Sequence, residues 1–70
     1  MTRRKVTITM AEARTRLKRA LEADTEHTRY FVEITLFQVS GEINRDAANE
    51  LIEEFNITEK VGIRPYGSFI

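Results

Sequence analysis

The sequence predicts a two-layer α+β domain with the element order β-α-β-α-β, in which a three- to four-stranded sheet carries two helices on one face. Two stretches repeat apolar residues at the spacing of a helix, and they alternate with segments rich in β-branched and aromatic residues. The chain has 70 residues and no Cys. Residues 1–70 are therefore expected to form one domain that folds without disulfides.

The first strand and the first helix are predicted from the N-terminal third of the chain. Polar and β-branched apolar residues alternate over residues 5–9, which is typical of a short strand. Thr9 and Glu12 have the spacing of a capping box, in which each side chain accepts a hydrogen bond from the other residue's backbone N–H. A helix is therefore expected from Met10 to near Asp24. Its apolar positions are Met10, Ala13, Leu17, Ala20 and Leu21.

A long central strand is predicted over residues 28–39, which read TRYFVEITLFQV. A second helix is expected over residues 45–55, because Asn44 is a favourable N-cap and Asp46 suits the first turn. Asn56 before Ile57 resembles a left-handed C-terminal cap. The apolar positions of this helix are Ala47, Ala48, Leu51, Ile52 and Phe55.

The C-terminal segment is predicted to complete the sheet. Residues 61–64 read as a short third strand, residues 64–67 fit a type I turn with Pro65 in its second position, and residues 68–70 are candidates for pairing back. If the long strand lies between the other two, right-handed crossovers put both helices on the same face. The other face of the sheet is then open.

The open face is predicted to be apolar, since both sides of the long strand carry apolar residues. The side turned to the helices holds Tyr30, Val32, Ile34 and Leu36. The open side holds Phe31, Glu33, Thr35, Phe37 and Val39. Two interpretations are left open: the C-terminal residues Tyr66, Phe69 and Ile70 fold back over this face, or it is an interface with a second copy or another protein.

The second predicted helix carries a ladder of carboxylates, formed by Asp46, Glu50, Glu53 and Glu54. Like charges at four-residue steps repel one another weakly. The ladder either faces the basic edge of the first helix, or is solvated, or recognises a basic surface such as that of a nucleic-acid-binding protein.

Basic residues are concentrated in the first half of the chain, which has eight Lys or Arg against five Asp or Glu, whereas the second half has three against six. The candidate nucleic-acid-binding residues are Arg3, Arg4, Lys5, Arg14, Arg16, Lys18 and Arg19. Residues 3–23 resemble the first half of a ribbon-helix-helix DNA-binding dimer, with residues 5–9 as the ribbon. That resemblance implies that Thr7 and Thr9 face bases. The family requires a second helix after a short turn, where this sequence predicts a strand, and the net charge of zero disfavours nucleic acid as the main ligand.

Catalytic and cofactor chemistry is sparse, because the chain has one His, no Cys and no Gly-rich phosphate loop. His27 near Asp24 and Glu26 is a weak metal-ligand set on an expected turn. Glu33 is a single carboxylate without a paired acid or base. No catalytic, cofactor or metal site is predicted, and the protein is not expected to be an enzyme.

The function predicted from these features is that of a small non-enzymatic module that binds another protein as an inhibitor or adaptor. It would bind through the open sheet face, the acidic helix, or both. A phage or mobile-element origin would suit such a protein. The partners considered are another protein, including a nucleic-acid-binding one, a second copy of the chain, and, less favoured, nucleic acid. Since no apolar run has the length of a membrane span, a cytoplasmic location without membrane binding is expected.

Overall fold

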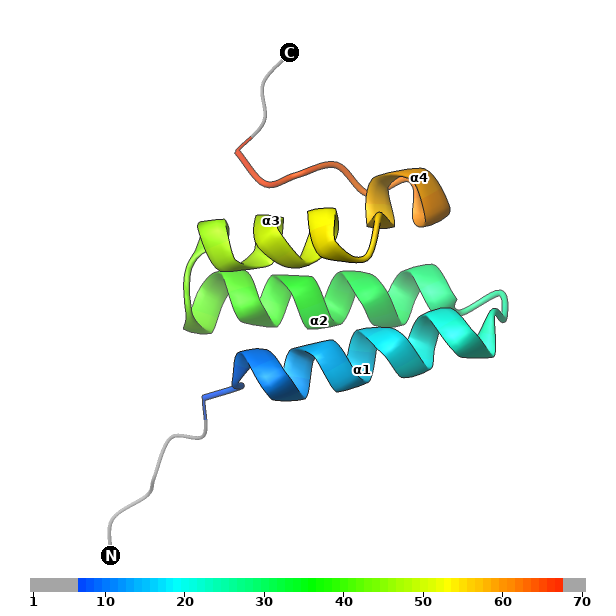
Figure 1. Cartoon of the computed structure of the whole chain (residues 1–70), viewed down its shortest axis with the longest axis horizontal. Helices are drawn as coiled ribbons and strands as arrows, with labels where there is room; N and C mark the ends of the chain where they lie inside the picture. The colour runs from blue at the N-terminus through cyan, green and yellow to red at the C-terminus, as the bar shows by residue number, and fades with distance from the viewer. Residues whose placement is uncertain (1–6, 68–70) are drawn as a thin grey trace, which may run out of the picture.

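The computed structural model describes residues 7–67, and all of the regular secondary structure in that range is helical. The four helices are α1 (Met10–Ala23), α2 (Thr28–Glu42), α3 (Arg45–Glu54) and α4 (Ile57–Val61) (Figure 1). The predicted α+β fold is wrong, because no strand forms in the described part of the chain.

Helix α1 begins and ends where its local sequence predicts. The hydroxyl of Thr9 accepts a hydrogen bond from the backbone N–H of Glu12 at 3.0 Å, and the Glu12 carboxylate accepts one from the N–H of Thr9 at 3.4 Å. Asp24 ends the helix in the left-handed region, and its N–H donates to the carbonyl of Ala20. The capping box is therefore confirmed.

Helix α2 occupies the segment for which the sequence predicts the long strand. Its buried residues are Thr28, Val32, Thr35, Leu36 and Val39. Their separations of four, seven, eight and eleven residues from Thr28 place them on one side of a helix. The strand prediction fails because the seven apolar residues among the twelve from Thr28 to Val39 fall at spacings that suit both a strand and a helix, and a segment of this length favours a helix.

Helix α3 is also confirmed near its predicted bounds. The Asn44 side chain caps it by accepting a hydrogen bond from the N–H of Ala47 at 2.7 Å, and Asn56 has the predicted left-handed backbone with φ of 54°. The third strand predicted at residues 61–64 is wrong. Residues Ile57–Val61 form α4 instead, and Gly62 ends that helix with φ of 82°.

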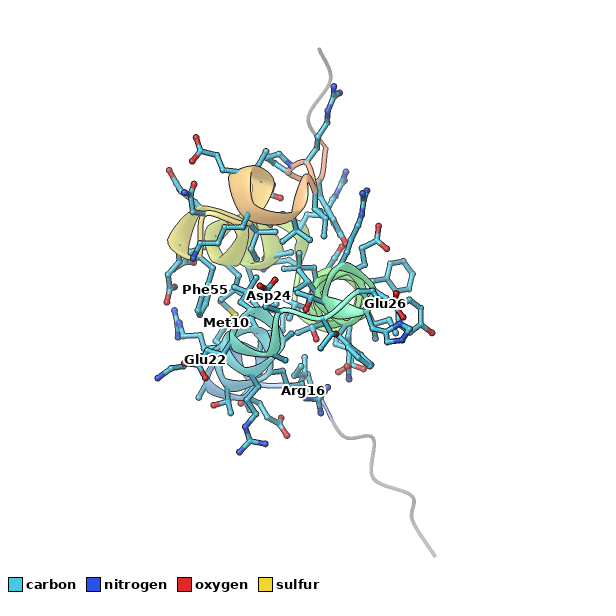
Figure 2. All side chains as sticks on the ribbon, turned by 90° about the vertical axis from the view of Figure 1, so that its right-hand side faces the viewer. Met10, Arg16, Glu22, Asp24, Glu26 and Phe55 are labelled. Carbon is cyan, nitrogen blue, oxygen red and sulfur yellow. The ribbon has the colours of Figure 1, made fainter. Side chains whose placement is uncertain are left out.

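The core lies among the helices, with α2 between α1 and α3 (Figure 1). Met10 of α1 and Phe55 at the end of α3, both labelled in Figure 2, are partly buried and pack against it. The fully or nearly buried apolar side chains are Ile8, Ala13, Leu17, Val32, Leu36, Val39, Ala47, Ala48, Leu51, Ile52, Ile57 and Ile63. Because α2 contributes to this core from one side only, its opposite side faces solvent.

The segments that flank the helices are held by side chains. Residues 7–9 form no strand, but Ile8 is buried, and its N–H donates to a carboxylate oxygen of Glu42 at 2.7 Å. The rest of the predicted first strand and the pairing of residues 68–70 lie outside the described residues. Near the C-terminus, Asn49 accepts a hydrogen bond from the N–H of Tyr66 at 2.6 Å and donates one to its carbonyl at 2.9 Å.

Candidate binding surface

Four large apolar side chains are exposed on the side of α2 that faces away from the core. Their exposed fractions are 60% for Tyr30, 52% for Phe31, 44% for Ile34 and 75% for Phe37. We call these four side chains the outer stripe. With full areas of roughly 150–250 Å² for large side chains, the outer stripe exposes on the order of 450 Å² of apolar surface. A monomeric soluble protein rarely exposes more in one patch unless the patch is functional.

The first groove beside the outer stripe lies between α1 and α2 and has a volume of about 400 Å³. Its lining includes Ala20, Ala23, Phe31 and Ile34, together with Arg16 and Arg19. Small apolar residues of α1 and apolar side chains of α2 therefore meet two guanidinium groups here. Such a groove can accept an apolar side chain next to a carboxylate.

The second groove lies on the other side of Ile34 and has a volume of about 340 Å³. It is lined by Tyr30, Glu33, Ile34, Phe37 and Tyr66. The pair of hydrogen bonds to Asn49 fixes the backbone of Tyr66 at this place. Burial, and then the nearby charge of Glu33, raise the pKa of the Tyr66 hydroxyl above its ordinary value.

The two edges of the outer stripe carry opposite charges. Glu33, on the side of the second groove, has a single ion pair within residues 7–67, a distant one with Arg29 at 3.9 Å. On the side of the first groove, Arg16 donates to Gln38 at 3.0 Å and lies 3.9 Å from Glu12. Arg19 makes no ion pair within residues 7–67. Among the described residues, a guanidinium without an ion pair and a weakly paired carboxylate thus flank the same apolar surface.

The structure divides the residues that the sequence places on the open sheet face. Phe31, Glu33 and Phe37 are exposed, whereas Thr35 and Val39 are buried. The hydroxyl of Thr35 donates to the carbonyl of Phe31 at 2.9 Å, so this buried side chain is satisfied within α2. The prediction that the five residues share one face is wrong, because alternate residues share a face in a strand but not in a helix.

The carboxylate ladder of α3 is partly paired inside the molecule. Arg14 of α1 lies 3.0 Å from Glu54 and 4.0 Å from Glu50. The contact between the basic edge of the first helix and the acidic helix, one of the interpretations of the sequence, is therefore present. Asp46 and Glu53 are exposed and make no ion pair with another described residue.

The candidate nucleic-acid-binding residues do not form one patch in the described chain. Arg14 reaches toward α3 and Arg16 toward α2, while Lys18 and Arg19 are exposed. Arg3, Arg4 and Lys5 lie outside the described residues. As the ribbon-helix-helix pattern requires, α2 is a second helix that follows α1 after residues 24–27. Residues 7–9 of the expected ribbon form no strand, however, and the Thr9 hydroxyl caps α1.

Residues 7–67 contain neither a cluster of metal ligands nor a helix suited to span a membrane. In that range no three His, Cys, Asp or Glu side chains gather as metal ligands. His27 is exposed, with its Nε2 atom 3.7 Å from a carboxylate oxygen of Glu26, a neighbour labelled in Figure 2. None of the helices in this part of the chain combines the length and the apolar character needed to span a bilayer.

Tyr30 and Ile34 belong to the outer stripe but were predicted to face the helices of a sheet domain. The signal that could have placed them is the spacing of four and three residues between Tyr30, Ile34 and Phe37, which aligns them on one side of a helix.

Comparison with known proteins gives no match to a family model, a curated protein or a solved structure.

Proposed function

We propose that this chain is a protein-binding module that docks its partner on the outer stripe of α2. The observation that carries the proposal is the exposure of four large apolar side chains on one side of a helix whose other side is in the core. Aromatic residues at such positions are frequent anchors of protein interfaces. The module acts as an adaptor or inhibitor by covering an apolar surface of its partner.

The energy available from the outer stripe is sufficient for binding only when the partner is complementary. Burial of about 450 Å² of apolar surface contributes roughly 11 kcal/mol at 25 cal/mol per Å². Association costs about 4–15 kcal/mol in lost translational and rotational freedom. The partner must therefore add apolar surface of its own, and the two grooves beside Ile34 provide places for its side chains.

The carboxylate ladder of α3 has a smaller part in this proposal than the outer stripe. Glu50 and Glu54 are already close to Arg14, so a basic partner would have to compete with that contact. Exposed ion pairs contribute at most about 1 kcal/mol. We therefore assign the main binding energy to the aromatic side chains of α2.

Affinity capture with matched variants tests the proposed function. The wild-type chain, Phe37→Ser and the control Lys18→Ser are immobilised and exposed to a lysate of the source organism, after circular dichroism has shown that all three are folded. We expect Phe37→Ser to lose the captured protein and Lys18→Ser to retain it, because Phe37 is the most exposed member of the outer stripe and Lys18 lies on α1. Equal capture by Phe37→Ser would reject the outer stripe as the docking surface.

Nucleic-acid binding is the second candidate function, favoured by the presence of α2 directly after α1 as the ribbon-helix-helix resemblance requires. It predicts retardation of a DNA duplex that weakens steeply with salt. Replacing Arg3, Arg4 and Lys5 together by Ala should abolish this retardation. Absence of retardation by the wild-type chain at low salt would exclude this function.

A further inference from the structure

The exposed side of α2 has the residue spacing of a helix that packs against another helix. Tyr30, Ile34, Phe37 and Gly41 follow one another at steps of four, three and four residues. This is the spacing of the core positions of a coiled coil, which places one narrow seam along a helix. The seam spans two heptads and lies opposite the buried side formed by Val32 and its neighbours.

Gly41 lies on this seam in the last turn of α2, and no contact within residues 7–67 requires a glycine there. A Cβ added at this position would meet no atom within 4 Å. Glycine is the poorest helix former after proline, so its presence inside a helix needs a compensating role. Close approach of a second backbone to the seam is such a role.

The charges beside the seam select the orientation of that second helix. Arg19 lines the first groove with Ile34, and Glu33 lines the second groove with Ile34. The two charged residues therefore flank the same level of α2 on opposite edges. Neither has a close ion pair in the described residues, since the contact of Glu33 with Arg29 is 3.9 Å long.

We propose that the outer stripe binds the same surface of a second copy of this chain, with the two α2 helices side by side and parallel. The inference rests on the proposed function and names its partner. A two-fold axis parallel to α2 places each seam residue beside its own copy and brings the acidic edge of one copy to the basic edge of the other. Glu33 then faces Arg19 of the second copy. An antiparallel pair centred on Ile34 would instead bring Glu33 close to Glu33 of the second copy.

The area of the surface agrees with a small but specific dimer. A standard interface buries roughly 800 Å² on each partner, and the outer stripe supplies on the order of 450 Å² of it. The apolar walls of the two grooves, which include Ala20, Ala23 and Tyr66, lie directly beside the stripe and extend the surface.

Sedimentation equilibrium tests the dimer and its charge pairing. We expect the wild-type chain to sediment as a dimer, Phe37→Ser to dimerise about 100-fold more weakly, and the control Lys18→Ser to be unchanged. Glu33→Arg should weaken the dimer, and adding Arg19→Glu should restore it. Glu22→Arg, on an exposed position of α1 labelled in Figure 2, is the matched charge control.

Cysteine cross-linking tests the orientation, since the chain has no Cys of its own. Tyr30→Cys and Gly41→Cys should each form a disulfide-linked dimer under mild oxidation, because a parallel pair brings each position next to itself within disulfide reach. Glu22→Cys should not. If Gly41→Cys does not cross-link with itself but does cross-link with His27→Cys, the pair is antiparallel, and the proposed orientation is overturned.

The possible results separate this inference from the proposed function. A wild-type chain that stays monomeric at every concentration, yet captures a different protein that Phe37→Ser loses, would overturn the dimer and leave the proposed function in place. A dimer that Phe37→Ser does not weaken, together with capture that it does not change, would overturn both.

Discussion

Two neighbouring residues of α2, Leu36 and Phe37, should differ sharply in their contribution to stability. Leu36 is 0% exposed and Phe37 is 75% exposed, although both are large apolar side chains. We expect Leu36→Ala to lower the free energy of unfolding substantially, because it leaves a cavity in the core. Phe37→Ala should leave it nearly unchanged, because the ring contributes little to the core of a single chain.

The size of the difference follows from the burial of the two side chains. Leu36→Ala removes three buried carbons at about 0.8 kcal/mol each, and the cavity term brings the loss to about 3 kcal/mol. A small domain of this size has a total stability of only about 5 kcal/mol. The midpoint of thermal unfolding should fall by roughly 12–24 °C. A surface substitution such as Phe37→Ala is expected to stay within about 0.5 kcal/mol.

Urea unfolding followed by circular dichroism at a dilute, monomeric concentration measures both values. Val39→Ala is the informative companion variant, because a strand would place Val39 on the same face as Phe37 whereas the helix buries it. Equal losses for Phe37→Ala and Leu36→Ala, or no loss for Val39→Ala, would refute the orientation of α2.

Three further predictions concern the segments that flank the helices. Thr9→Ala should cost about 1 kcal/mol in urea unfolding, because it removes the capping hydrogen bond of 3.0 Å at the start of α1; an unchanged midpoint would contradict this cap. Glu42→Ala should cost about 1–2 kcal/mol through loss of the 2.7 Å bond from the buried N–H of Ile8, and Glu42→Gln should retain most of that stability because it keeps an acceptor. The pKa of Tyr66 is raised by burial and then by Glu33, so the neutral hydroxyl contributes stability that is complete below pH 10.0 and should be lost as the pH rises through the folded-state pKa. The urea midpoint of Tyr66→Phe should therefore fall less at alkaline pH than that of the wild-type chain, and an identical fall would reject the effect.

The starts of α1 and α3 could be predicted because they are set by local chemistry. The Thr9–Glu12 capping box and the Asn44 cap each involve residues three apart, so the sequence alone contains both partners. The left-handed Asn56 was predictable for the same reason. The strand predicted at residues 61–64 was wrong because the two β-branched residues of this segment favour a strand. The short helix α4, which ends at Val61, depends on packing against α3, and local sequence does not show that contact.

The orientation of α2 could not be derived from local propensity. Its β-branched and aromatic residues favour a strand, whereas the length of the segment and its packing against α1 and α3 favour the helix. The exposure of Phe31 and Phe37 was expected, but on the assumption that the segment is a strand. That assumption placed Thr35 and Val39 on the open face and turned Tyr30 toward the helices. The binding role of the exposed residues stays a prediction.

Nuclear magnetic resonance with a soluble paramagnetic probe tests the central claim most directly, namely that α2 is a helix with one core side and one exposed apolar side. In a dilute monomeric sample we predict helical Cα shifts throughout α2, strong broadening of the Phe37 ring signals, and protected methyl signals for Val32 and Val39. Extended-chain shifts across this segment, or equal broadening of Phe37 and Val39, would contradict the account.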